Sequence, residues 1–81
     1  MPVKVRLFAA ARAAAGTESM QVPAGPLVSV LDGLIVDHPA LAEVLPRCSY
    51  LIDGLAVHGD PVDVLVPEGA ELDVLPPFAG G

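Results

Sequence analysis

The sequence predicts an α+β domain in which a small sheet packs against one main helix. Residues 3–7 and 71–75 each alternate apolar and polar side chains, the two-residue period of strands with one buried face. Between these segments, five apolar residues repeat at the spacing of one helix face: Leu27, Val30, Leu31, Leu34 and Ile35. An amphipathic helix must bury this stripe, and the apolar face of a sheet is the surface available for it.

The composition indicates one small domain with an aliphatic core. The chain has 81 residues, 53% of them hydrophobic but only 4% aromatic, and this length leaves no room for a second core. Small domains have much surface for their volume, so some apolar side chains must remain outside. Exposed apolar surface is typical of proteins that work in complexes.

Ten acids against four bases give a formal charge of −6. This balance argues against nucleic-acid binding, which needs clustered Lys and Arg. It favours a partner with a basic groove, although acidity also keeps an apolar protein soluble. Cys48 is the single cysteine, so no intrachain disulfide forms and no oxidising compartment is implied. No signal-peptide region or membrane-length apolar run is present, and we expect a cytoplasmic protein without a membrane partner.

The first half of the chain predicts strand, short helix, strand and main helix. Residues 9–15 are alanine-rich, which favours a helix, and Gly16 follows where a C-cap glycine belongs. Residues 19–22 alternate as a second strand. A loop over residues 24–26 then places Pro26 in the first turn of the main helix. Gly33 lowers the stability of that helix by about 1 kcal/mol relative to alanine. We expect this glycine to permit close packing of the helix on the sheet.

The second half predicts a short helix, a hairpin and a closing strand. Residues 40–45 form the short helix, stopped by Pro46. Residues 49–52 and 55–57 are predicted to form a hairpin around Asp53-Gly54, because Asp-Gly supplies the positive φ angles of a two-residue type I′ turn. Residues 62–66 form a short apolar segment of ambiguous type.

The closing strand runs directly into the most informative segment, Leu75-Pro76-Pro77-Phe78-Ala79-Gly80-Gly81. The prolines lack N–H donors and end the strand ladder. We therefore expect residues 76–81 to leave the domain as a flexible tail ending in a free carboxylate. Glycines without a Cβ let such a tail enter a narrow channel. A frayed terminus is the alternative interpretation.

Two segments carry a family resemblance: Val-Arg-Leu-Phe-Ala-Ala-Ala-Arg-Ala-Ala-Ala-Gly at residues 5–16, and Gly-Ala-Glu-Leu-Asp-Val-Leu-Pro-Pro-Phe-Ala-Gly-Gly at residues 69–81. They resemble the MoaD branch of the ubiquitin-like sulfur carriers, the small subunits of molybdopterin synthase. The Pro-Pro-x-x-Gly-Gly ending is the most specific part, since the related thiamine-pathway carriers usually lack the two prolines. This sequence departs from the family at two positions. Many members carry an acid at the position of Ala13, and the hairpin often has an asparagine at the position of Asp53.

The resemblance implies a β-grasp fold in which the first and last strands lie side by side and parallel in the middle of the sheet. It also implies that an E1-like, MoeB-type enzyme uses ATP to adenylate the carboxylate of Gly81, and that a sulfur donor converts it to a thiocarboxylate. The tail then enters the large MoaE-type catalytic subunit of a heterotetramer, where sulfur passes to a cyclic pyranopterin precursor. The implied partner-binding residues are Leu75, Pro76, Pro77, Phe78, Ala79 and Gly80. We further expect that the chain itself binds no cofactor and is a non-catalytic sulfur-donor subunit.

Three other functions fit the residues: a sulfur carrier for thiamine or cysteine synthesis, a ubiquitin-like modifier joined to lysines, and a plain interaction domain. Cys48 is either a persulfide relay or, more simply, a small partly buried hydrophobe. The histidines lack metal-ligand spacing, and the acidic pairs in residues 60–73 are expected on solvated faces. The arginines at 12 and 47 contact a partner or remain solvated.

Overall fold

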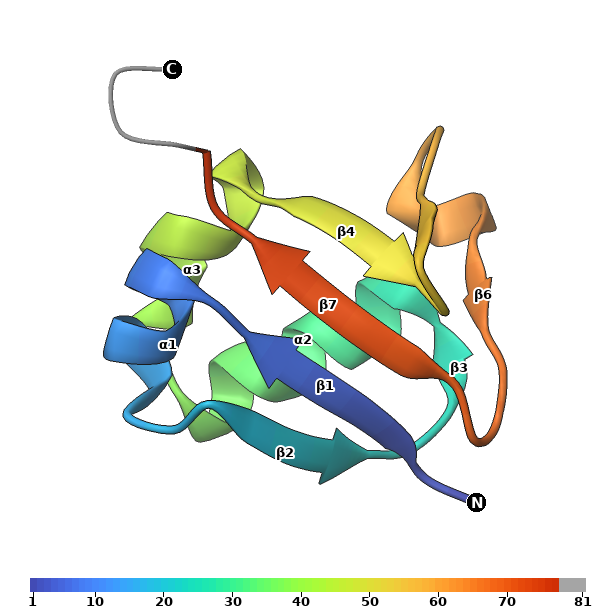
Figure 1. Ribbon diagram of the computed structural model, residues 1–81, viewed down its shortest axis with the longest axis horizontal. Coiled ribbons are helices and arrows are strands. Elements are labelled where there is room, and N and C mark those ends of the chain that lie inside the picture. Colours follow the sequence, from blue (N-terminus) through green and yellow to red (C-terminus); the bar gives the residue numbers. More distant parts are fainter. Residues whose placement is uncertain (78–81) are drawn as a thin grey trace.

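The computed structural model describes residues 1–77. A five-stranded sheet has the strand order β2-β1-β7-β4-β5 (Figure 1). Its strands are β1 (Val3–Leu7), β2 (Ser19–Val22), β4 (Ser49–Ile52), β5 (Leu55–Ala56) and β7 (Glu71–Leu75). A second, two-stranded sheet pairs β3 (Gly25–Pro26) with β6 (Leu65–Val66). The helices are α1 (Ala9–Ala15), α2 (Leu27–Asp37) and α3 (Leu41–Val44), with 3-10 turns η1 (Leu45–Arg47) and η2 (Pro61–Asp63).

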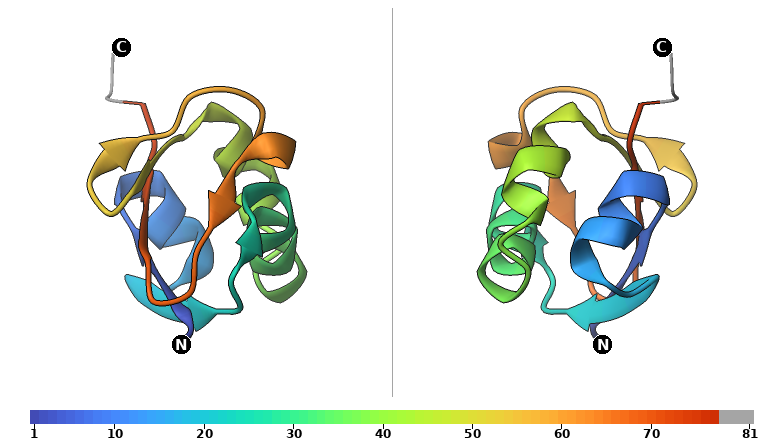
Figure 2. Two further views of the ribbon diagram at one scale, coloured as in Figure 1. Left: turned by 90° about the vertical axis from the view of Figure 1, so that its right-hand side faces the viewer. Right: turned by 90° about the vertical axis from the view of Figure 1, so that its left-hand side faces the viewer.

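The first and last strands form the centre of the sheet. β1 and β7 are parallel, with Val5 opposite Leu72, and β7 is antiparallel to β4. The helices cover one face of the sheet, as the side views show (Figure 2). This arrangement confirms the predicted α+β class, and it confirms the central parallel pair that the family resemblance implied.

The covered face of the sheet and the helices enclose one aliphatic cluster. Val5, Leu7, Leu72 and Val74 contribute from the two central strands, each at most 2% exposed. The other buried members come from β1, β6, the helices, η1 and the turn before β7: Val3, Ala11, Leu27, Val30, Leu34, Leu41, Leu45, Val66 and Ala70. The stripe predicted for the main helix is therefore the stripe that α2 buries or half-buries.

Two turns confirm their predicted chemistry. Gly16 ends α1 in the left-handed region at φ 72°, and its N–H donates to the Arg12 carbonyl. Asp53 and Gly54 have φ of 49° and 83°, as a type I′ turn requires. The Asp53 N–H donates to the Glu71 carbonyl, and its Oδ1 accepts from the Glu71 N–H, both at 2.9 Å. The hairpin turn is thus tied to the start of the central strand.

The expectation for Gly33 was wrong. This residue lies on the exposed side of α2, and a Cβ built on it meets nothing within 4 Å. Close packing on the sheet therefore does not require a glycine here. Its presence still costs helix stability, because glycine loses more backbone entropy than alanine in a helix.

Three boundaries also differ from expectation. Pro26 precedes α2 in an extended conformation and belongs to β3, because Gly25 pairs with Val66 instead of forming a loop. Pro46 does not stop the helical segment but sits in η1, since proline is tolerated in a first turn. The ambiguous residues 62–66 divide between η2 and β6. Among residues 1–77, no helix is both long and apolar enough to cross a membrane.

Candidate functional site at the end of β7

The C-terminal end of β7 is held on both sides. The Val74 carbonyl accepts a hydrogen bond from the Phe8 N–H at 3.3 Å, and Leu75 lies opposite Ser49 of β4. Beyond this pair, Pro76 is half-buried and Pro77 is exposed. Because neither proline can donate to a ladder, the chain leaves the sheet immediately after Leu75.

The structure places three of the predicted site residues, Leu75, Pro76 and Pro77, at this exit. The predicted anchor Phe78, and Ala79, Gly80 and Gly81, lie outside the described residues. Their roles stay predictions.

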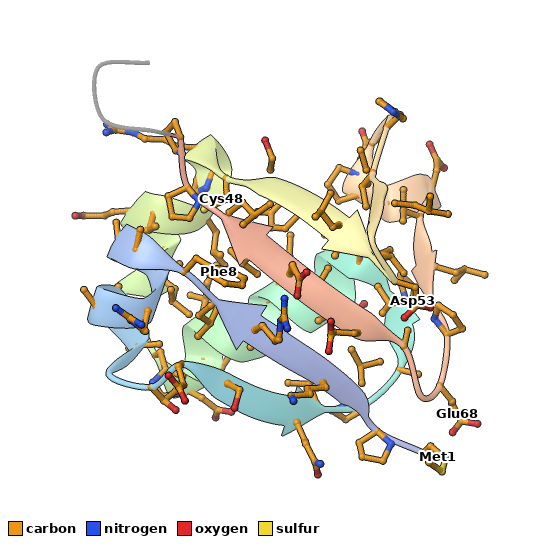
Figure 3. All side chains as sticks on the ribbon, in the orientation of Figure 1. Met1, Phe8, Cys48, Asp53 and Glu68 are labelled. Atoms are coloured by element: carbon orange, nitrogen blue, oxygen red, sulfur yellow. The ribbon has the colours of Figure 1, made fainter. Side chains whose placement is uncertain are left out.

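The exit is surrounded by the beginnings of two other elements. Since β1 and β7 are parallel, the turn from Phe8 into α1 lies at the same end of the sheet (Figures 1 and 3). The antiparallel β4 begins there too, directly after η1 and Cys48. Arg12 of α1 and Arg47 of η1 are both exposed. An acidic chain therefore carries two of its four bases on elements that border the tail exit.

A hollow of about 230 Å³ lies beside this end of the sheet. Lys4, Arg6 and Arg12 line it, together with Phe8. The Arg6 guanidinium lies 5.3 Å from the Phe8 ring centroid, within cation–π range. Glu18 also lines the hollow, and acids of β7 pair with Arg6, so Lys4 and Arg12 are the bases that remain for a partner here.

The prediction that Asp73 lies on a solvated face was wrong. Asp73 is 7% exposed, and its carboxylate accepts from Arg6 Nε at 2.9 Å and from a second Arg6 nitrogen at 3.4 Å. Glu71 adds a longer ion pair to the same Arg6, at 3.6 Å. The ion pairs of Arg6 with Asp73 and Glu71 were not predicted from the sequence. The strand alternation assigns these residues to polar faces, but only the β1–β7 register places Arg6 beside Asp73.

In the described part of the chain, the remaining acids and histidines do not gather into a metal site. Asp60 caps η2, where its Oδ1 accepts from the Val62 N–H at 2.9 Å. Within residues 1–77, no three His, Cys, Asp or Glu side chains cluster closely enough to hold a metal ion.

Cys48 is poorly suited to sulfur relay. Its thiol is half-buried and donates to the Val44 carbonyl at 3.3 Å, and burial raises its pKa. Tyr50 lies beside it and donates to the Leu45 carbonyl at 2.7 Å. Burial, and secondarily the charge of a Cys48 thiolate, raise the pKa of Tyr50 to about 12. Because the thiolate is the reactive form of cysteine, these shifts favour the inert interpretation of Cys48.

Solved structures identify the fold and the family. No family model matches the sequence, and no curated protein matches it. The solution structure of small archaeal modifier protein 1 from Methanosarcina acetivorans is 30% identical, with a TM-score of 0.86 over 99% of this chain and 96% of that one. The chain belongs to the MoaD/ThiS family of ubiquitin-like sulfur carriers. Its β-grasp fold is the one that the sequence resemblance implied.

Two further solved structures align over the entire chain. Small archaeal modifier protein 1 from Haloferax volcanii is 26% identical, with a TM-score of 0.83 over 100% of both chains. A structure of the complex of subunits 1 and 2 of the molybdopterin-converting factor from Helicobacter pylori 26695 gives 22% identity and a TM-score of 0.72, again over 100% of both. The latter likeness concerns the fold.

Proposed function

We propose that this chain is the sulfur-carrier small subunit of a molybdopterin synthase. The observation that carries the proposal is a Pro-Pro-Phe-Ala-Gly-Gly ending placed directly after a central strand. Hydrogen bonds and strand pairing hold that strand up to Leu75. A fixed root and a tail whose last three residues are small are suited to presenting one terminal carboxylate to several enzymes in turn.

The chemistry of the proposal begins with activation of the Gly81 carboxylate. A carboxylate is a poor electrophile, so one of its oxygens attacks the α-phosphorus of ATP in an E1-like enzyme and pyrophosphate leaves. A sulfide-level donor then attacks the acyl carbon and AMP leaves, which gives a thiocarboxylate. Within the large catalytic subunit, this sulfur is transferred to the cyclic pyranopterin precursor.

The residues around the exit have distinct roles in this proposal. Pro76 and Pro77 restrict the backbone at the root of the tail, which lowers the ordering entropy of insertion. Phe78 anchors the tail in an apolar pocket of the partner. Arg12 and Arg47 complement an acidic rim around the partner's channel.

A second candidate function is protein modification, which the likeness to the two archaeal modifier proteins favours. The activation step is shared, but a lysine amine of a target then displaces AMP or sulfide and forms an isopeptide bond. A sulfur carrier for thiamine or cysteine synthesis shares the thiocarboxylate and differs in the acceptor.

Intact-mass analysis tests the shared step. After incubation with an activating enzyme, ATP and sulfide, one oxygen of the chain should be replaced by sulfur, and a variant lacking Gly81 should remain unchanged. An unmodified wild-type chain would contradict every carrier function.

Adding the large subunit and the pyranopterin precursor tests the specific assignment. The loaded chain should return to its original mass as the dithiolene product forms. Loading without this transfer rejects the synthase role, and lysine-linked conjugates recovered from cells would then support the modifier function.

A further inference from the structure

A groove between β2 and α2 lies away from the tail and has no role in the proposed sulfur chemistry. It measures about 340 Å³, and its lining includes Val22, Pro23 and Ala24 on one side and Val30, Gly33 and Asp37 on the other. Figure 2 shows β2 and α2 on either side of the lower edge of the molecule. We propose that this groove binds an extended, basic segment of a partner protein.

The edge of β2 offers backbone groups to such a segment. The Leu7 N–H donates to the Glu18 carbonyl, whereas the Lys4 N–H donates to Ala70, away from β2. Hydrogen-bonded and non-bonded pairs alternate along an antiparallel ladder. The N–H and C=O of Gln21, opposite Lys4, therefore point away from β1 and toward the outside of the sheet. An extended chain laid along this edge can pair with them.

The edge is short, which limits the length of the added ladder. The Ser19 carbonyl already accepts a hydrogen bond from Thr17 Oγ1 at 3.0 Å, and Pro23 ends β2. The partner segment consequently pairs around Gln21 alone and places its other contacts in the groove.

Gly33 keeps the α2 side of the groove open. It is exposed, and no internal packing requires it, since a Cβ there meets nothing within 4 Å. The absence of a side chain allows another backbone to approach the helix closely. Val36, one turn further along α2, is 78% exposed and offers an apolar contact beside the groove.

The charge of the groove specifies a basic segment. Asp37 is the last residue of α2, and the last turn contains no base. The carboxylate thus adds to the negative end of the helix dipole, a position that favours a cation. The sequence supplies no Lys or Arg between Ala13 and Pro46. A lysine or arginine of the partner segment would therefore be stabilised here.

The location of the groove separates this site from the tail. Val22 pairs with Val3, at the opposite end of β1 from Leu7 and the tail exit. The groove can consequently be occupied while the tail is inside a partner's active site. The carrier would then hold a second protein during loading or transfer.

The test uses the isotope-labelled full chain and capped seven-residue peptides of alternating valine and threonine that end in lysine. NMR titration should shift the amides of Gln21, Gly33 and Asp37, and a matched peptide ending in glutamate should bind at least about two- to fivefold more weakly. Gly33→Leu fills the groove without removing a packed group and should abolish the shifts. Asp37→Asn should weaken binding about two- to fivefold. Asp32→Asn, an exposed acid of α2 outside the groove lining, should leave it unchanged.

Three results with the peptides would overturn the proposal. These are the absence of shifts with every lysine peptide, equal binding of the glutamate peptide, and unchanged binding by the Gly33→Leu variant. Shifts of the same amides with protein concentration alone would identify a second copy of this chain as the occupant and would also reject it. The Gly33→Leu variant should still accept sulfur at Gly81, so failure of this site remains distinguishable from failure of the carrier function.

Discussion

The two faces of the five-stranded sheet differ sharply, although the same strands build both. On the covered face, Val5 and Leu72 are completely buried as members of the aliphatic core cluster. On the uncovered face, the residues next to them carry the ion pair of Arg6 with Asp73. Alternate residues of a strand point to opposite faces, so one face supplies stability while the other remains available for polar contacts. The predictions below test how independent these faces are.

The largest expected effect is on the covered face. Leu72→Ala should lower the free energy of unfolding by about 2–5 kcal/mol, because it leaves a cavity between the central strand and the helices. Leu51 is the matched control, since it lies opposite Asp73 on the uncovered face and is only half-buried. Leu51→Ala should lower the free energy of unfolding by less than about 1 kcal/mol. Equal losses in urea denaturation would contradict the division between the faces.

The next effect tests the uncovered face. Asp73→Asn should destabilise the fold by about 1.5 kcal/mol, the lower end of the range for charged hydrogen bonds, because the Arg6 side chain is 42% exposed and solvent screens the pair. When Arg6 is already replaced by Met, Asp73→Asn should lower the free energy of unfolding by clearly less, because the two residues are coupled. A double-mutant cycle with no coupling would show that the ion pair contributes nothing.

A smaller, stabilising effect is expected on the outer side of the covering layer. Gly33→Ala should raise the free energy of unfolding by about 1 kcal/mol, because alanine favours a helix and its Cβ meets no neighbour. Thermal unfolding measures the change. The exposed Ser29→Ala on the same helix serves as a reference and should change stability less. A loss of stability in Gly33→Ala would mean that the glycine has a structural role after all.

The smallest effect near neutral pH concerns Tyr50, which lies at the margin of the covered face. Tyr50 is the single tyrosine and the chain has no tryptophan, so tyrosinate absorbance reports this residue alone. Its pKa should be about 12 in the folded chain and about 10 in denaturant. Because the folded pKa is raised, the stabilising contribution is complete below about pH 10 and is lost as the pH rises through 12.

Two variants check the cause of this shift. Tyr50→Phe should remove the pH dependence, and Cys48→Ala should lower the Tyr50 pKa slightly because the thiolate charge is lost. A native midpoint equal to the denatured one would show that the phenol is not desolvated.

Much of the fold could be predicted because its signals are local. The alternation in residues 3–7 and 71–75 correctly assigned the inward faces of both central strands, since successive side chains of a strand must point to opposite sides. The helical stripe, the Gly16 cap and the Asp53-Gly54 turn were also correct. β3 was missed because a two-residue strand has no period to detect, and it forms only through pairing with β6.

The candidate site also has features that were predicted from local sequence and features that depend on the tertiary structure. The tail was recognised from its residue types, and the structure adds the location of its root at the end of the central strand. The surrounding bases of α1 and η1 could be named from the sequence as candidates. Their positions beside the exit depend on the strand order, which no local pattern specifies.

The sequence by itself therefore determined the elements, their buried faces, the hairpin turn and the proline-glycine ending. Each of these depends on residues a few positions apart, where spacing and backbone chemistry restrict the choice. Only the tertiary structure decided that Arg6 meets Asp73 across 67 positions of sequence and that Gly33 faces solvent beside an open strand edge. Such contacts depend on the register and order of distant strands, which are set by how all the apolar faces pack into one core.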